Sequence, residues 1–212
     1  MPFASRFITA IDDIPAQQWN AIAGIDYPFL RHEFLSALET SGSVHRNRGW
    51  QPLHLLVYEN DALCAAMPLY IKSHSYGEYV FVWSWAEAYH QHGLDYYPKL
   101  LSAIPFTPAQ GARLAHQQKN PGALFQYVTE TLSNICQSQG FSGWHVLFSQ
   151  AEENLHFQST TALARVGCQF HWFNQDYADF EGFLASCTSR KRKTLRKERQ
   201  KVIAEGVSFQ RL

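Results

Sequence analysis

The sequence has 212 residues, of which 46% are hydrophobic and 15% aromatic. This apolar content is enough for a packed core, and it excludes a disordered chain or a collagen-like polymer. The 18 basic and 18 acidic residues balance overall but are unevenly placed. Residues 1–180 hold nine Lys or Arg against fifteen Asp or Glu, whereas residues 181–212 hold nine against three. The sequence therefore predicts an acidic body followed by a basic segment.

The N-terminus and the cysteines point to a reducing compartment. Residues 1–6 lack the apolar stretch of a signal peptide, and no apolar run approaches the ~20 residues that span a bilayer. The four cysteines are far apart, form no C-x-x-C pair, and are too few for a disulfide scaffold in a chain of this length. We therefore predict a cytoplasmic protein without an integral membrane segment.

Helix and strand patterns are mixed along the chain. In its first half we expect a strand over 3–11, helices over 14–22 and 31–41, a hairpin over 52–71 and a strand over 79–83. In its second half we expect a helical turn over 86–92, a strand over 99–106, a helix after Gly111 that ends near Gly140, a strand over 144–148, a helix over 155–166 and a strand over 169–173. This mixture predicts an α/β (α+β) fold, in which helices cover a mixed sheet.

The basic segment has its own organisation. Residues 189–201 read as a strongly basic helix that Gly206 stops, and residues 207–212 look like the beginning of a strand. A strand at the end of a chain needs a neighbour, so we expect the protein to continue. We predict one domain over 1–185, and a basic connector helix with the start of a truncated second domain over 186–212.

The segment over 100–114 has the order strand, proline-bearing loop, glycine, helix. A helix N-terminus offers unpaired N–H groups and the positive end of the helix dipole, which suits a phosphate. Gly111 would allow close approach of a ligand and Arg113 would add charge, so the pattern predicts cofactor binding by Gln110, Gly111, Ala112 and Arg113. The alternative is an ordinary strand-to-helix turn, because one glycine is a weak signal.

An aromatic and polar cluster predicts a ligand cleft. Its expected substrate-binding residues are Tyr76, Tyr79, Trp83, Trp85, Tyr96, Tyr97 and Lys99. Dense rings with a few polar tips are typical of such clefts. Glu78 or His74 would accept a proton from an amine nucleophile within hydrogen-bond reach. The alternative is an aromatic core whose polar atoms bond to the backbone.

Two further groups of residues have candidate roles. His90 and His92 would share a face of an extended segment, but no Cys/His framework accompanies them, so we expect no metal site. The basic helix would hold tRNA or another polyanion through Arg190, Lys191, Arg192, Arg196 and Lys197. The alternatives are a solvated helix or one lying on an anionic membrane, and its few apolar positions argue against insertion.

Several strings together resemble one known family. The most specific runs from His74 to Phe81, His-Ser-Tyr-Gly-Glu-Tyr-Val-Phe, and others are Ile104-Pro105-Phe106-Thr107-Pro108 and Tyr96-Tyr97-Pro98-Lys99-Leu100-Leu101. Along essentially its whole length the chain resembles bacterial peptidoglycan biosynthesis/recognition proteins. These are placed in the GNAT N-acyltransferase superfamily, near the Fem-type aminoacyltransferases.

The resemblance implies the N-terminal half of a tandem protein with two GNAT-like domains, each a mixed, splayed β-sheet with helices on both faces. In GNAT enzymes the donor's pyrophosphate sits on the loop between the fourth strand and the next helix, with the pattern Gln/Arg-x-x-Gly-x-Gly/Ala. Gln110, Gly111 and Ala112 stand in that place with a different spacing. In Fem-type enzymes the donor is an aminoacyl-tRNA, the acceptor is a peptidoglycan precursor, and the donor site relies heavily on the second domain.

Two functions follow. The first is an N-acyltransferase-type domain that moves an acyl or aminoacyl group from acyl-CoA or aminoacyl-tRNA onto an amine of a cell-wall precursor, with no tightly bound cofactor. The second is a non-catalytic recognition domain whose aromatic cleft binds a cell-wall precursor or peptide.

Overall fold

The computed structural model describes residues 3–80 and 83–210. The chain divides into two compact units, Met1–Val166 and Gly167–Leu212. This division lies earlier in the chain than the boundary expected after residue 185, and the assignment of domains to these regions stays a prediction. Within the described residues, no helix combines the length and the apolar character needed to cross a membrane.

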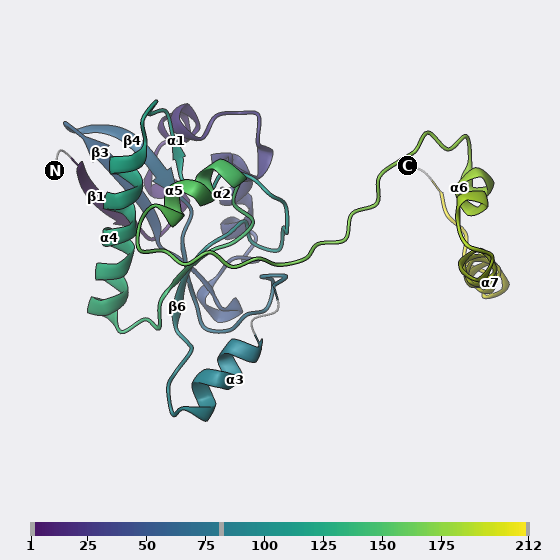
Figure 1. The fold of residues 1–212 in the computed structure, drawn as a ribbon. Helices are drawn as coiled ribbons and strands as arrows, with labels where there is room; N and C mark the ends of the chain where they lie inside the picture. Colours follow the sequence, from purple (N-terminus) through teal and green to yellow (C-terminus); the bar gives the residue numbers. More distant parts are fainter. Residues whose placement is uncertain (1–2, 81–82, 211–212) are drawn as a thin grey trace. The chain divides into compact units, whose positions relative to one another are not determined.

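The first unit contains two four-stranded sheets, coloured purple to green in Figure 1. The first sheet has the order β1-β3-β4-β7 and is antiparallel throughout, with β1 Phe3–Ile8, β3 His54–Glu59, β4 Ala62–Met67 and β7 Ala115–His116. The second has the order β2-β5-β6-β8, with β2 Trp50–Pro52, β5 Tyr70–Lys72, β6 Lys99–Ser102 and β8 Trp144–Val146. Only the pair β6–β8 is parallel.

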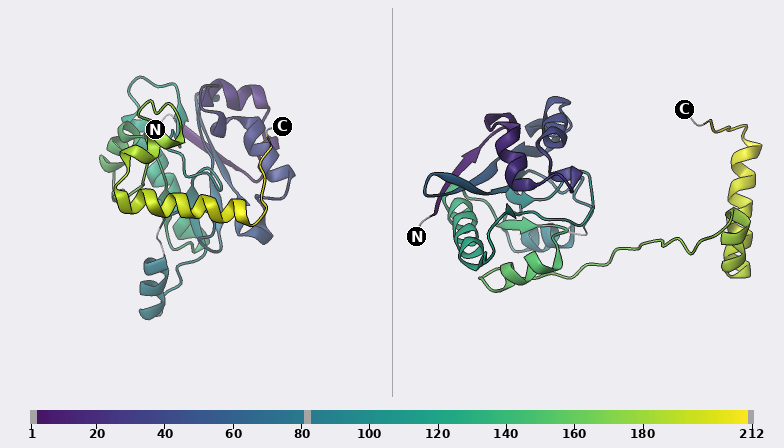
Figure 2. Two further views of the ribbon diagram at one scale, coloured as in Figure 1. Left: turned by 90° about the vertical axis from the view of Figure 1, so that its right-hand side faces the viewer. Right: turned by 90° about the horizontal axis from the view of Figure 1, so that it is seen from above.

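Helices cover both faces of the first sheet (Figures 1 and 2). They are α1 Ala16–Ala23, α2 His32–Thr40, α4 Gly122–Gln139 and α5 Ala151–Gln158, with α3 Trp83–Gln91 beside the second sheet and short 3-10 turns at Ile11–Asp13, Pro28–Leu30 and Arg46–Arg48. Side chains alternate along β3: Leu55 and Val57 pack with the α4 cluster, and Leu56 packs with α1 and α2. A strand with apolar residues on both faces requires this two-sided cover.

Local signals account for the regular elements that were expected. Asn60 and Asp61, with φ of 50° and 63°, form the two-residue turn that joins β3 to β4. Helix α4 buries Leu124, Val128 and Leu132, one turn apart on one face, and it ends where Gly140 adopts a φ of 68°. The mixed α/β fold with helices on both faces is therefore confirmed.

The second unit is a helix pair preceded by an extended segment. Helix α6 Phe180–Ser186 begins where the Asp179 side chain accepts a hydrogen bond from Gly182 N, and α7 Ser189–Ala204 follows it. The rings of Trp172, Tyr177 and Phe183 contact one another beside α6. The basic helix expected over 189–201 is confirmed and extends to Ala204.

Some expected elements are wrong. Residues 169–173 and 207–210 form no strand and pair with no strand among the described residues, and residues 211–212 lie outside the described part. The helix expected over 155–166 ends at Gln158. The strand expected over 79–83 is also wrong where the structure describes it. Tyr79 has a φ of 57°, which is not an extended conformation, and Trp83 is the first residue of α3. Phe81 and the Trp83 side chain lie outside the described residues.

Candidate functional site

The helix expected after Gly111 is absent: β7 follows at Ala115, and the next helix begins at Gly122. A Cβ at Gly111 would lie 2.3 Å from the Tyr27 ring, so a tyrosine side chain occupies the space that a ligand would need. The Tyr27 hydroxyl also donates to Ala109 O at 3.2 Å. The dipole argument that placed a phosphate at this glycine is therefore wrong, because no helix starts there.

Arg113 is fully buried and holds the loop together. Its Nε donates to Leu147 O at 2.9 Å and its Nη2 to Ala109 O at 2.7 Å. Its Nη1 donates to both Gly111 O and Ala112 O at 3.0 Å. These bonds use four of the five N–H donors of the guanidinium, and the side chain is fully buried, so Arg113 is committed to the loop rather than presented to a phosphate. In this conformation Arg113 stabilises the loop.

The other two residues expected at the donor site do not form a phosphate cradle either. The exposed Gln110 side chain donates through Nε2 to Ser149 O at 3.1 Å. Ala112 is half-buried beside the apolar cluster around α1 and α2. These contacts tie residues 110–113 to the segment that follows β8, which explains why the loop is ordered without being a helix start.

The loop that joins the fourth strand of the first sheet to the next helix is instead residues 117–121, between β7 and α4. It reads Gln117-x-x-Asn120-x-Gly122, which has the spacing of the GNAT pattern with asparagine at the first glycine position. Pro121 precedes the first turn of α4, whose leading N–H groups have no acceptor within the helix. This spacing is visible in the sequence. It was not recognised because β7 has only two residues, too few to show the alternation that marks a strand.

A pocket of about 300 Å³ opens at this loop. It lies between the β7–α4 loop, the start of α4 and α5, and its lining includes Ala112, Leu114, Ala115, His116, Gln118, Lys119, Pro121, Phe125, Gln150, Glu152, Glu153 and His156. Lys119 is an exposed cation in this lining, and Glu152 is an exposed acid. The volume suits part of a nucleotide-type ligand rather than a whole one.

Two histidines and a phenylalanine form one wall of the pocket. Phe125 packs edge-on against His116 at 5.8 Å and stacks on His156 at 4.9 Å, measured between ring centroids. Burial lowers the pKa of His116, and the nearby charge of His156 lowers it further. Among the described residues the buried Nδ1 of His116 has no hydrogen-bond partner. A neutral imidazole at this position is able to accept a proton.

Glu153 fixes the backbone that leads into β7. Its carboxylate accepts hydrogen bonds from Arg113 N at 2.9 Å and from Leu114 N at 2.6 Å. Burial raises the pKa of Glu153, and these backbone hydrogen bonds oppose the rise. The carboxylate therefore orders the strand beside the pocket.

The structure brings only part of the expected aromatic cleft together. Tyr96, Tyr97 and Lys99 lie side by side, with ring centroids of Tyr96 and Tyr97 5.0 Å apart and Lys99 Nζ 4.7 Å from the Tyr96 ring. Tyr76 and Tyr79 expose 66% and 63% of their surface on the loop that precedes α3. Trp85 lies on α3 and is 49% exposed.

The expected base Glu78 is buried in the loop between β5 and α3, against β6 of the second sheet. It is 2% exposed, and its Oε2 accepts a hydrogen bond from Lys99 Nζ at 2.9 Å. His74 is half-buried: its ring fills the space over Gly49, and its Nδ1 accepts from Tyr76 N at 3.2 Å. Neither residue lines the pocket beside α4. The prediction that Glu78 meets a substrate in a cleft therefore finds no support, because a buried ion pair engages its carboxylate.

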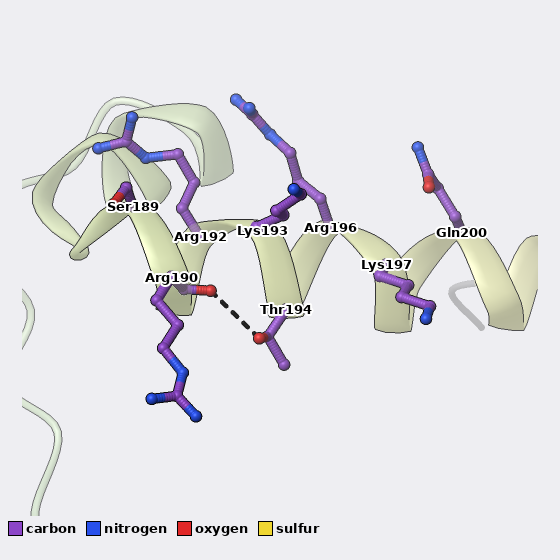
Figure 3. A pocket seen from close by; sticks show the side chains of 8 residues that line it. All are labelled: Ser189, Arg190, Arg192, Lys193, Thr194, Arg196, Lys197 and Gln200. Atoms are coloured by element: carbon purple, nitrogen blue, oxygen red, sulfur yellow. Dashed lines mark hydrogen bonds between the residues drawn. The ribbon is translucent and has the colours of Figure 1, made fainter.

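Figure 3 shows five of the basic side chains of α7, namely Arg190, Arg192, Lys193, Arg196 and Lys197. Arg192 donates to Leu184 O, Ala185 O and Cys187 O, and so it caps the end of α6. Arg196 pairs with Glu181. The remaining residues of the expected polyanion site, Arg190, Lys191 and Lys197, are exposed. The cations of this helix thus divide into those that hold the helix pair together and those that face solvent.

A family model described as FemAB_like, peptidoglycan biosynthesis/recognition, matches residues 10–212. The chain belongs to this family. No curated protein matches its sequence. The family expected from the sequence strings is therefore confirmed.

Solved structures of acetyltransferases resemble this one weakly. A ribosomal-protein-alanine N-acetyltransferase from Brucella melitensis biovar Abortus 2308 is 8% identical with a TM-score of 0.46, over 80% of this chain and 99% of that one. An aminoglycoside acetyltransferase from an uncultured soil metagenomic sample, in complex with trehalose, is 14% identical with a TM-score of 0.41, over 82% and 97%. A GCN5-related N-acetyltransferase from Ralstonia eutropha JMP134 is 13% identical with a TM-score of 0.39, over 77% and 97%. At TM-scores below 0.5 we draw no conclusion from these likenesses.

Proposed function

We propose that this FemAB-like chain is an N-acyltransferase domain that moves an acyl or aminoacyl group onto an amine of a peptidoglycan precursor. The family match over residues 10–212 supports the reaction class and the cell-wall acceptor. The observation that carries the proposal is the pocket at the β7–α4 loop. There a helix start, a cation and a neutral imidazole surround one cavity.

The loop before α4 would hold the donor's phosphate groups. The free N–H groups of the first turn of α4 and the positive end of its dipole favour an anion, and Lys119 adds a charge beside them. Glu152 lies in the same lining and opposes this attraction. Acyl-CoA and aminoacyl-tRNA both present phosphate groups, so the geometry suits either donor.

His116 would act as the base in place of Glu78 or His74. The attacking amine must lose a proton, and a base works best when its pKa lies near the working pH. Burial keeps the His116 imidazole neutral at neutral pH, and the ring lines the same pocket as Lys119. We expect His116→Asn to lower the rate of CoA release about 100-fold or more while leaving donor affinity within twofold.

The exposed cations of α7 would hold a polyanion such as tRNA. Arg190, Lys191 and Lys197 face solvent on one unit that the aromatic cluster and α6 stabilise. The cytoplasmic location and the continuation into a second domain, which we predicted from the sequence, belong to this proposal. Arg192 and Arg196 contribute less, because their guanidinium groups already bond within the helix pair.

The recognition domain is the second candidate function. It is favoured by the burial of Glu78 and Arg113, because two residues expected to work on substrates are instead committed to internal contacts. In that case a muropeptide would bind and neither donor would.

The pair Gly122→Asp and Gly122→Ala tests the proposal. A Cβ at Gly122 would meet nothing within 4 Å, so neither change is blocked sterically. A carboxylate at the start of α4 should weaken binding of coenzyme A at least tenfold by repulsion, and Gly122→Ala should bind within twofold of the unchanged chain. Isothermal titration measures both. Equal affinity of the two variants, or binding of muropeptide alone by the unchanged chain, would reject the donor site.

A further inference from the structure

Two buried lysines lie next to each other on adjacent strands of the second sheet. Lys72 on β5 and Lys99 on β6 are register partners, and both are fully buried. Glu78, in the loop between β5 and α3, is buried and pairs with Lys99. The loop thus brings one acid to a pair of buried lysines.

One acceptor atom of this cluster, the second carboxylate oxygen of Glu78, is left without a hydrogen bond among the described residues. Lys99 Nζ donates to Glu78 Oε2 at 2.9 Å, and it lies 3.4 Å from both Ser75 Oγ and Tyr96 OH. Lys72 Nζ donates to Tyr76 O at 3.2 Å and lies 3.6 Å from the Trp50 ring centroid. Within the part of the chain that the structure describes, the buried Glu78 Oε1 has no hydrogen-bond partner.

The electrostatics show that both lysines depend on this one carboxylate. Burial lowers the pKa of Lys72 to about 7, Glu78 opposes the change, and the charge of Lys99 adds to it. Burial likewise lowers the pKa of Lys99, with Glu78 opposing and Arg165 adding to the effect. The cluster holds two buried lysines and one carboxylate, and a bound anion would favour the protonated form of both lysines.

The backbone that carries Glu78 is held in an uncommon conformation. Its neighbours Gly77 and Tyr79 both have positive φ, 80° and 57°. A tyrosine at φ of 57° costs free energy, and such strain persists where surrounding contacts hold it. The Tyr76 and Tyr79 rings are largely exposed, so the outer side of this loop faces solvent while its one carboxylate points inward.

We propose that Lys72 and Lys99 form a carboxylate-binding site, and that Glu78 occupies it as an internal substitute for the carboxylate of a ligand such as a peptide or an amino acid. Displacement of the loop over 73–79, which carries Ser75 and Glu78, would free the Lys72 and Lys99 amino groups to receive the ligand. The site lies apart from the pocket beside α4, and the inference does not rest on the proposed transfer reaction.

Glu78→Ala removes the buried carboxylate and leaves space for a small anion in its place. The variant leaves the lysines without a counter-ion, so we expect its Tm to fall by about 5–10 °C in chloride. Sodium formate at the same ionic strength should restore at least half of that loss, and the unchanged chain should gain less than 1 °C. Glu87→Ala is the matched control, because Glu87 is exposed on α3, and formate should leave its Tm unchanged.

A second variant keeps the test decisive if Glu78→Ala does not fold in chloride. Formate should then restore the far-UV circular dichroism of Glu78→Ala, and Glu78→Ala with Lys99→Met should fold in chloride and show no formate effect. Phosphate in place of formate tests whether the site prefers a different oxyanion. Stabilisation by phosphate but not by formate would overturn the assignment to a carboxylate. The proposal also fails if neither anion stabilises the variant, or if the double variant responds as strongly.

Discussion

Arg113→Met separates a structural role of this side chain from a role in binding a donor. Methionine retains most of the aliphatic volume but removes every donor, so Leu147 O, Gly111 O, Ala112 O and Ala109 O lose the guanidinium. Each buried acceptor left without a partner costs about 1–3 kcal/mol, while removal of a buried cation returns several kcal/mol of desolvation. The net loss in free energy of unfolding should be about 3 kcal/mol.

Urea unfolding followed by circular dichroism measures this loss, and thermal unfolding should show a Tm lower by about 6–12 °C. Arg6→Met is the matched control: Arg6 is exposed on β1, and its replacement should change the free energy of unfolding by less than ~0.5 kcal/mol. A loss below 1 kcal/mol together with a drop in affinity for coenzyme A would refute the structural role. It would reinstate Arg113 as the phosphate ligand that the sequence first predicted.

Three other outcomes are expected. Gly111→Ala should lower the free energy of unfolding by about 2 kcal/mol, because the new Cβ would lie 2.3 Å from the Tyr27 ring. Urea unfolding measures this loss, and an unchanged urea midpoint would contradict the packing of Tyr27 against Gly111. Burial lowers the pKa of His145 to about 4, so as pH falls from about 6.5 to 4 the unfolded state binds a proton that the folded state does not. Stability should therefore fall by up to about 3 kcal/mol over that window, and urea unfolding at pH 7, 5.5 and 4.5 should show a smaller decline for His145→Gln; identical profiles would rule this out. Arg190→Ala should reduce the slope of log tRNA affinity against log salt concentration by about one unit. Arg192→Ala should reduce this slope less, because the Arg192 guanidinium is bonded within the helix pair. Equal slopes for the two variants would contradict this difference between the two arginines.

The elements that the sequence predicts correctly are those with a long or strongly marked local signal. Helix α4 repeats buried residues at helical spacing from Leu124 to Cys136 and ends at a glycine, and α7 is a run of good helix formers. The hairpin over β3 and β4 has a two-residue turn between apolar runs. In each case local propensity and tertiary packing favour the same structure.

The site was harder to predict because burial is a property of the whole fold. Lys99 and Arg113 read as ligand-binding cations, but both side chains are buried and bonded within the protein. The strand β7 is two residues long, too short to show a period, and so the loop before α4 was not recognised as the loop after the fourth strand. Gly111 suggested a helix start, but its lack of a side chain serves packing against Tyr27.

The positions of the charged groups favour one arrangement of the proposed chemistry. A transferase needs an anion-accepting end for the donor and a neutral base, and both must reach one cavity. Lys119 and His116 line the pocket beside α4. Glu78 and Lys99 neutralise each other inside the second sheet, where a proton exchanged with an amine would first require breaking a buried ion pair. The loop before α4 is therefore the place to look for transfer chemistry, and the buried lysine pair is the place to look for a carboxylate.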